Sequence, residues 1–527
     1  MKVIDFTYKK TNSFSNLIID LNEGKNSIKP FINREFDIKK IPEQIQEKSK
    51  QSINRKSIVK ALKNQYKDIS ITNKVASNID KLILENTFTI SAGHQLCLFT
   101  GPLYYLYKII SVLNLTEHLN FKYPQYNFIP IYWMGSEDHD FEEINHFNVF
   151  SKKICWNKKT NSQAVGRMDT DNLLDVFNDF KQVLGNSEHG NTLLKLFKDA
   201  YLQNNTMAFS QRFLVNNLFG KYGLVCLDSD DQILKNNFIS FVKKDILKSS
   251  YKQLISNTSF KLDKDYHSQA YARNINHFYI DNRGVRSRIY KDNKTYNLLK
   301  QKNIFTDRDI QQEIENNPKS FSQNVLTRAL FKEFTLPNLV TIGGGGELAY
   351  WLQMKDVFAK EKIVFPMLKL RNSALIIDKI NIKKLDKLNI QITEIFKNKD
   401  ELILNYIKQK SSTLNLLSEK KLLEEVFTSI ESKAIDDTLK RTIKSEKKKN
   451  LNTLNVLEKK LIKHEKKFHE DSIKKIESIK EKLFPNNTLQ ERYVNFSQFY
   501  LNYGDMFIDH LKIALKEDRE FSLILID

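Results

Sequence analysis

Cysteine is scarce in this chain: its 527 residues include only Cys97, Cys155 and Cys226. None of them shows the CxxC spacing of a metal or redox site, and their odd number argues against a disulfide framework. We therefore interpret them as small core residues and expect a reducing, cytoplasmic setting. No signal peptide is recognised, and no apolar run reaches the roughly 18 residues of a membrane span, so we expect no membrane contact.

Acidic residues are too few to balance the basic ones. The chain has 83 lysines and arginines against 63 aspartates and glutamates, which gives a formal net charge of +20. Such an excess favours an anionic partner, which could be nucleic acid or a small molecule. Neither a zinc-finger spacing nor an RNA-recognition signature accompanies the charge, so nucleic acid is the weaker alternative.

Glycine and proline are absent from residues 367–484. A stretch of this length without either residue predicts helix, and its apolar residues recur at helical spacing. Lysine and glutamate fill the other positions, as expected of long antiparallel helices or a coiled coil. We therefore predict a core (1–375), a helical domain (376–485) and a C-terminal segment (486–527) that packs back on the core.

Before residue 367 the pattern alternates between strand and helix. Residues 88–91 predict a buried strand, a helix follows from Pro102 to about His118, and residues 128–134 predict the next strand. Strand, glycine-containing loop, helix and strand form a βαβ unit, which is typical of a parallel sheet. Residues 222–228 predict a further strand of that sheet. The fold class that follows is α/β.

The loop after the first strand is a candidate binding segment, because open parallel sheets bind ligands beyond the carboxyl ends of their strands. Thr100 and Gly101 precede the helix, whose first backbone N–H groups lack intrahelical partners and attract phosphate or carboxylate. Lys108 on the same helix adds positive charge. The candidate binding residues here are Gly93, His94, Gln95, Thr100, Gly101, Tyr104 and Lys108.

An acidic run follows the second strand, over residues 136–146. We interpret it as one wall of a cleft, although acids at a solvated helix start are the simpler alternative. Asp138, His139 and Asp140 are the candidate catalytic residues, because they could accept a proton or position an amine. They could also hold magnesium, but aspartate beside histidine is common and we predict no resident metal site. Further candidate binding residues are Glu137, Asn145 and His146.

A glycine-rich loop follows a third apolar run. Its four glycines permit close backbone approach to a ligand, but the Gly-Lys-Ser/Thr ending of a Walker loop is missing. A tight turn that needs positive φ is the alternative. Upstream arginines could bind carboxylates or phosphates, although each alone could equally form a surface ion pair. The candidate binding residues are Gly343, Gly344, Gly345, Gly346 and Glu347, with Arg273 and Arg328 from a set of arginines that also includes Arg286 and Arg288.

Four long motifs, in this order, resemble one family of enzymes. They are GHQLCLFTGPLYYLYK, PIYWMGSEDHDFEEINH, NVLTRALFKEFTLPNLVTIGGGGELAYW and LFPNNTLQERYVNF. They are similar to the cysteine-adding ligases of bacillithiol biosynthesis, the BshC family, over most of the chain. The resemblance implies a Rossmann-like core with connecting insertions and a C-terminal coiled coil that supports a homodimer. It also implies that L-cysteine is joined to the amine of glucosaminyl-malate through an amide bond. His94, Asp265 and Gly345 differ from the residues that we associate with the family.

The implied reaction needs activation of the cysteine carboxylate, for which ATP with Mg²⁺ is the simplest source. The helix start at Thr100 and Gly101, with the glycine loop opposite, would then cradle the anion. The arginines would bind the malate carboxylates. Two alternatives from other classes stay open: an RNA-binding protein with a core like that of class I aminoacyl-tRNA synthetases, and a coiled-coil scaffold without activity.

Overall fold

The structure is a computed structural model that describes residues 1–299, 304–411 and 416–526. The chain divides into two compact units. One contains residues 3–374 and 491–523, and the other contains residues 1–2, 375–490 and 524–527. Strands β1 (Lys2–Phe6), β14 (Ser373–Asp378) and β15 (Phe521–Ile526) each run from one unit into the other. None of the helices in the described residues combines the length and apolar character needed to cross a membrane.

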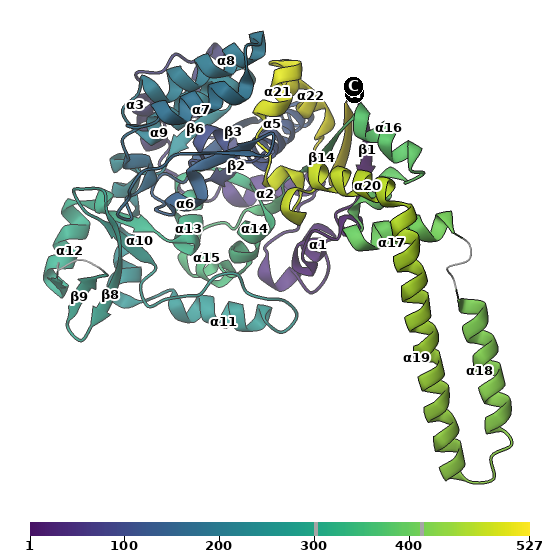
Figure 1. The fold of residues 1–527 in the computed structure, drawn as a ribbon. Coiled ribbons are helices and arrows are strands. Elements are labelled where there is room, and N and C mark those ends of the chain that lie inside the picture. The colour runs from purple at the N-terminus through teal and green to yellow at the C-terminus, as the bar shows by residue number, and fades with distance from the viewer. Residues whose placement is uncertain (300–303, 412–415, 527) are drawn as a thin grey trace. The chain divides into compact units, whose positions relative to one another are not determined.

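The larger unit is built on a five-stranded sheet of order β13-β12-β2-β3-β6, in which all neighbours are parallel. Its strands are β2 (Thr87–His94), β3 (Asn127–Met134), β6 (Val225–Asp228), β12 (Asn338–Gly343) and β13 (Met367–Leu370). In chain order the sheet grows from β2 first to one side and then to the other, which is the doubly wound arrangement of Rossmann-like folds. Figure 1 shows β2, β3 and β6 side by side. The predicted α/β fold with a parallel sheet is confirmed.

The sheet buries an apolar core because its central strands are apolar along their whole length. Phe88, Ile90 and Ala92 of β2 pack with Val112 and Leu115 of α5 (Tyr104–Lys122). Helix α2 (Ile41–Lys48) and β12 add side chains to the same cluster. Continuous apolar strands are expected where helices cover a parallel sheet. The predicted βαβ unit is therefore present. Helix α5 begins at Tyr104, two residues after the predicted start at Pro102.

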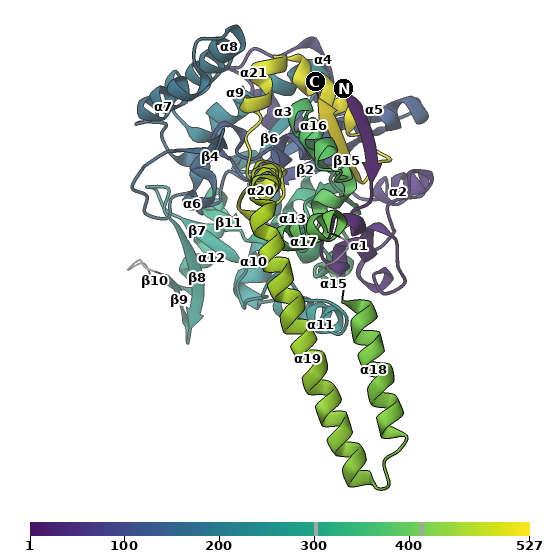
Figure 2. The same ribbon diagram turned by 45° about the vertical axis from the view of Figure 1, so that its right-hand side comes forward.

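An antiparallel sheet is inserted between β6 and β12 and has the order β10-β9-β8-β7-β11. Figure 2 shows β7 to β10 beside α12 (Asp307–Asn316). Its strands are β7 (His277–Ile280), β8 (Arg286–Asp292), β9 (Thr295–Leu298), β10 (Ile304–Thr306) and β11 (Phe321–Gln323). A hairpin of β4 (His146–Val149) and β5 (Lys152–Cys155) follows β3. These are the connecting insertions that the family resemblance implied.

Helices complete the larger unit. They are α1 (Asn16–Asn22), α3 (Arg55–Gln65), α4 (Asn73–Lys81), α6 (Phe141–Ile144), α7 (Leu174–Leu184), α8 (Glu188–Phe197), α9 (Met207–Phe219), α10 (Gln232–Lys248), α11 (Lys252–Leu262), α13 (Val325–Thr335), α14 (Gly345–Leu352), α15 (Lys355–Glu361), α21 (Ser497–Tyr503) and α22 (Met506–Ala514).

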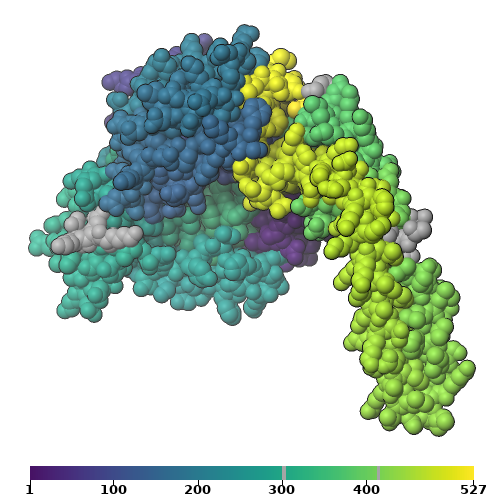
Figure 3. Space-filling view, viewed as in Figure 1, coloured from purple at the N-terminus to yellow at the C-terminus, as the bar shows by residue number. Residues whose placement is uncertain are grey.

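The smaller unit is helical, with α16 (Lys379–Lys387), α17 (Lys399–Lys410), α18 (Leu417–Glu431), α19 (Asp437–Phe468) and α20 (Glu470–Leu483). Helices α18 and α19 lie antiparallel, and their side chains pack together in Figure 3. The Asp436 carboxylate accepts the Leu439 N–H at 2.7 Å and caps α19. The predicted coiled-coil domain is confirmed.

The helical prediction was wrong for residues 367–378, which include β13 and all of β14. The absence of glycine and proline permits a strand as readily as a helix. Met367 and Leu370 are buried, and β13 gains a parallel partner in β12. Pairing with an existing sheet and burial on both faces decide the outcome, and neither is visible in the local pattern.

Candidate functional site

The carboxyl ends of β2, β3 and β12 bring most of the predicted residues to one edge of the sheet. The strands end at His94, Met134 and Gly343. Since the chain leaves β2 toward β3 and later returns on the other side at β12, the position between the ends of β2 and β12 is the switch point near which doubly wound folds bind ligands.

Lys108 lies at this switch point. Its Nζ atom donates to the Gly93 carbonyl at 2.7 Å and to Glu347 Oε2 at 2.6 Å. Gly93 lies at the end of β2 and Glu347 stands in the first turn of α14, after β12, so Lys108 connects the carboxyl ends of the two strands. The two side chains are 7% and 16% exposed. Lys108 is thus already paired with a carboxylate, and an anionic ligand at the switch point would compete with Glu347.

Asp138 is the centre of the acidic run. Its Oδ1 atom accepts the His139 N–H at 2.8 Å, and its Oδ2 atom accepts a hydrogen bond from Gln95 at 3.2 Å. Arg286 and Arg328 place guanidinium nitrogens 3.7 and 3.8 Å from its two oxygens. Burial alone would raise the pKa of Asp138, but the charges of Arg328 and Arg286 outweigh it and hold the pKa below its usual range.

Arg286 enters the site from β8 of the inserted sheet. Its guanidinium lies 3.9 Å from the centre of the Phe278 ring and donates to Ser322 Oγ at 3.0 Å and to the Gln323 carbonyl at 2.7 Å. The remaining nitrogen, NH1, donates to His139 Nδ1 at 2.9 Å. Burial lowers the pKa of Arg286 to about 10, so it remains charged at neutral pH. The two partners are 147 positions apart in the sequence, which is why sequence reasoning had not singled out Arg286 from its neighbours.

A divalent cation fits poorly beside this group. The possible ligand atoms of Asp138, His139 and Asp140 lie within 4.8 Å of one another. However, Arg286 occupies His139 Nδ1, and Asp138 already faces two guanidinium groups. These positive charges oppose a second cation at the same carboxylate.

Three other residues of the acidic segment turn away from this group. Glu137 is 1% exposed and forms a buried ion pair with Lys235. Asn145 donates to the Trp156 carbonyl at 3.5 Å, and its Oδ1 atom lies 3.0 Å from His146 Nδ1. The contacts of Asn145 and His146 thus support the β4–β5 hairpin. Glu137 was predicted to bind substrate, and in the structure its carboxylate is enclosed with Lys235.

At the predicted anion cradle of Thr100 and Gly101, the backbone N–H groups already have partners within the chain. Both backbone N–H groups donate to carbonyls of their own turn, and the Leu103 N–H donates to the Val494 carbonyl at 2.8 Å. The Asn495 side chain adds a donor to the Gly101 carbonyl at 2.6 Å. Thr100 is fully buried. The C-terminal segment therefore closes the start of α5, and no N–H group of these residues is left for an anion.

His94 is half-buried between Tyr104 and Tyr105, whose ring centres lie 5.4 and 4.9 Å away. Its Nδ1 atom lies 3.0 Å from the Gln95 carbonyl. Burial, followed by the charge of Lys108, lowers the pKa of His94 to about 3. His94 is therefore neutral at physiological pH and contributes an uncharged ring to the edge of the site.

The glycine loop is open on one side. None of its four glycines has a positive φ, so the alternative of a tight turn that needs positive φ is wrong. A Cβ atom on Gly343 would lie 2.8 Å from Leu348, and one on Gly345 would lie 3.2 Å from Ile18. Gly344 and Gly346 face open space. Gly345 and Gly346 line a cavity of about 430 Å³ together with Arg492.

Arg273 is an exposed loop residue, unlike Arg328, which α13 carries to Asp138. The backbone N–H of Arg273 donates to Asn276, and its charge acts on Arg288, where burial and this repulsion lower the pKa. Of the two arginines that sequence reasoning preferred, the structure brings only Arg328 to the acidic run.

Comparison with known proteins decides the family. The model of the BshC N-terminal Rossmann-like domain of bacillithiol biosynthesis matches residues 1–372, and that of the C-terminal coiled-coil domain matches residues 374–526. The chain belongs to the BshC family. A relative from Flavobacterium johnsoniae is 42% identical over 99% of both chains, and one from Flavobacterium psychrophilum is 43% identical over 97% of this chain and 96% of its own. Both are named "Putative cysteine ligase BshC".

Among solved structures, a "putative arginyl t-RNA synthetase" from Campylobacter jejuni aligns with this BshC-family chain over 84% of its length and 98% of the other. The two are 10% identical and the TM-score is 0.24, which is too low to support an argument about fold.

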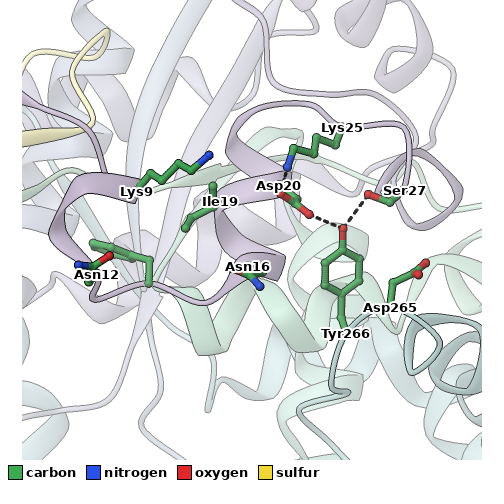
Figure 4. A pocket seen from close by; sticks show the side chains of 10 residues that line it. Lys9, Asn12, Asn16, Ile19, Asp20, Lys25, Ser27, Asp265 and Tyr266 are labelled. Atoms are coloured by element: carbon green, nitrogen blue, oxygen red, sulfur yellow. Dashed lines mark hydrogen bonds and ion pairs between the residues drawn. The ribbon is translucent and has the colours of Figure 1, made fainter. Parts of the chain in front are cut away.

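A second hollow of this BshC-family chain lies beside the glycine loop. It has a volume of about 670 Å³ and shares Phe14, Asn16, Asp265 and Tyr266 with the cavity at Gly345. In Figure 4, dashed lines join the Tyr266 hydroxyl to Asp20 and to Ser27. The hydroxyl donates to Asp20 Oδ2, with an O–O distance of 2.8 Å, and lies 2.7 Å from Ser27 Oγ. Sequence reasoning had no signal for these N-terminal residues, because they become neighbours of Tyr266 only through folding.

Proposed function

We propose that this protein is a ligase that joins the carboxyl group of L-cysteine to the amine of glucosaminyl-malate, with ATP as activating cosubstrate. The reaction would be the last step of bacillithiol biosynthesis and would form an amide bond. Membership of the family supports the pathway, and the name of the relatives supports cysteine as a substrate. The observation that carries the proposal is the group of Asp138, Arg286 and Arg328 at the carboxyl edge of the sheet.

This group suits a substrate that carries both carboxylates and an amine. Arg328 is 18% exposed and, among the described residues, its guanidinium makes no hydrogen bond, so its donors are available to a malate carboxylate. Asp138 and Asp140 offer negative charge to the ammonium group of the same molecule. Opposite charges placed a few ångströms apart would fix the orientation of glucosaminyl-malate before the reaction.

The chemistry proceeds in two steps. A carboxylate oxygen of cysteine attacks a phosphorus atom of ATP, and either pyrophosphate or ADP leaves. The sugar amine then attacks the activated carbonyl carbon, the carbon–nitrogen bond forms, and the bond to the phosphate oxygen breaks. The proton of the amine passes to a carboxylate, for which Asp140 is the exposed candidate. We propose that Mg²⁺ arrives with ATP as part of that substrate, since two guanidinium groups oppose a resident cation at Asp138.

The test is to incubate the full-length protein with L-cysteine, glucosaminyl-malate and magnesium-ATP, and to follow products by mass spectrometry. We expect bacillithiol to form only when ATP is present. Release of AMP would indicate an adenylate, and release of ADP an acyl phosphate. Binding of glucosaminyl-malate without product would contradict ATP as the cosubstrate. Absence of both binding and product, with salt-dependent binding of RNA, would favour the RNA-binding alternative.

A further inference from the structure

The His139 ring has its two nitrogens in different surroundings. Nδ1 lies 2.9 Å from Arg286 NH1 and 3.8 Å from Asp138 Oδ1. The first distance is a hydrogen bond and the second is too long for one. A guanidinium group has only donors, so Nδ1 must be the acceptor. The proton of the neutral ring is then carried by Nε2.

Arg286 cannot easily release this contact. Its side chain is 3% exposed, its flat face packs on Phe278, and its other nitrogens are bound to Ser322 and to the Gln323 carbonyl. Three elements of the inserted sheet thus determine where NH1 points. Because all of these contacts are short and buried, the direction of the bond to His139 is set before any ligand arrives.

The arrangement differs from that of a histidine base. A base of this kind usually donates Nδ1–H to a carboxylate, which leaves Nε2 free to take a proton. Here a cation stands where that carboxylate would be. Adding a proton to Nδ1 would set an N–H group against the donor of Arg286. In agreement, burial and then the charge of Arg286 lower the pKa of His139, against the opposing influence of Asp140 and Asp138.

We propose that Arg286 is a positioning residue that holds His139 in the neutral Nε2–H form, so that His139 donates a hydrogen bond to an anionic oxygen of the ligand instead of taking a proton from the amine. The identity of that oxygen rests on the proposed function, in which it belongs to the activated carboxyl group of cysteine. The protonation state of the ring does not rest on it. Among the described residues no partner of Nε2 is found, and the side chain is 26% exposed, so this nitrogen is accessible.

The first measurement is independent of activity. Full-length protein labelled with ¹⁵N-histidine gives long-range proton–nitrogen NMR correlations for its ten histidines, and His139→Gln identifies the signal. At pH 7 we expect an unprotonated Nδ1 and a protonated Nε2. A protonated Nδ1 in the unsubstituted protein would overturn the proposal, whether or not the protein makes bacillithiol.

Variants then test the role of Arg286. Arg286→Met should allow Nδ1 to become protonated and should lower kcat at least about tenfold, as expected for loss of an oriented hydrogen-bond donor. Arg286→Lys retains a hydrogen-bond donor. We therefore expect its Nδ1 signal and its kcat to lie between those of Arg286→Met and the unsubstituted protein. Arg283→Lys is the matched control, because Arg283 lies in the exposed turn before β8 and pairs with Asp281. An unchanged His139 signal in a folded Arg286→Met protein would contradict the proposal.

Discussion

At the scale of the single residue, Asp138 is the side chain on which the site most depends. Its carboxylate lies between Arg286 and Arg328 and is reached by Gln95. We predict that Asp138→Asn lowers kcat/KM for glucosaminyl-malate by about 100-fold or more, because the amide has no charge to orient an ammonium group or the two guanidinium groups. Steady-state assays by mass spectrometry measure this effect.

Measuring the stability of Asp138→Asn distinguishes a loss of catalysis from a loss of folded protein. Asparagine keeps the shape of aspartate and can still accept from the His139 N–H, so we expect a loss of about 1–2 kcal/mol in the free energy of unfolding. Glu142→Gln is the matched control, since Glu142 is an exposed acid of the same run. Full activity in Asp138→Asn would mean that the acidic run is structural.

His94 gives a prediction about stability. Its pKa in the folded protein is about 3, against about 6.5 in an unfolded chain. Between these values the unfolded chain binds a proton that the folded protein does not, so His94 destabilises the fold as pH falls from 6.5 toward 3, by up to about 1.4 kcal/mol per pH unit. His94→Gln should remove this part of the acid sensitivity.

Urea unfolding at several pH values between 7.5 and 4 measures the difference. The gap in unfolding free energy between His94→Gln and the unsubstituted protein should move in favour of the variant as pH falls. His464→Gln, at an exposed position of α19, serves as the control and should show no such trend. Parallel curves for His94→Gln would show that His94 is protonated without difficulty in the folded state.

At the scale of the secondary-structure element, the sequence correctly predicted those elements whose apolar residues recur with a regular period. The βαβ unit and the helical hairpin were recognised because burial of one face repeats along the chain. The start of α5 was misjudged because its N–H and carbonyl groups are satisfied by Val494 and Asn495, and Asn495 is 394 positions from Gly101. The sequence could not identify Arg286 as a site residue, because its partners are also distant in the sequence. Its partner His139 is a neighbour only after the inserted sheet has formed.

The hairpin of α18 and α19 carries apolar side chains that it does not bury. Neither helix has a fully buried residue, and Leu422, Leu457 and Leu461 are 62%, 46% and 43% exposed. Apolar residues that recur along a long helix pair are expected to be covered by a partner. We propose that a second copy of the chain covers them and that the protein is a homodimer.

The double variant Leu457→Glu, Leu461→Glu tests this proposal. Charges at these positions should convert the dimer to monomer in sedimentation or light-scattering measurements, because burying two carboxylates per chain is unfavourable. Lys460→Glu changes the charge of an exposed position on the same helix and should leave the dimer intact. A dimer that survives the double variant would place the interface elsewhere.

At the scale of the whole molecule, two sheets contribute to one site. The parallel sheet supplies Asp138, Gln95 and the Lys108–Glu347 bridge at its carboxyl edge. The inserted antiparallel sheet supplies Arg286, and α13, which follows it, supplies Arg328. The insertion thus adds Arg286 to cations that the rest of the Rossmann-like unit already supplies, so neither sheet alone forms the site.

The net charge of +20 gives the last prediction. A basic protein attracts anionic substrates, and salt screens this attraction over about 8–10 Å at physiological ionic strength. At saturating magnesium-ATP, we expect the KM for glucosaminyl-malate to rise about twofold to fivefold between about 50 and 200 mM KCl, with kcat nearly constant. L-Cysteine is the internal control, because it is a zwitterion without net charge and its KM should change little. Equal changes in the two KM values would mean that salt acts on the protein and not on the approach of the anion, and the basic surface would then have no part in capturing substrate.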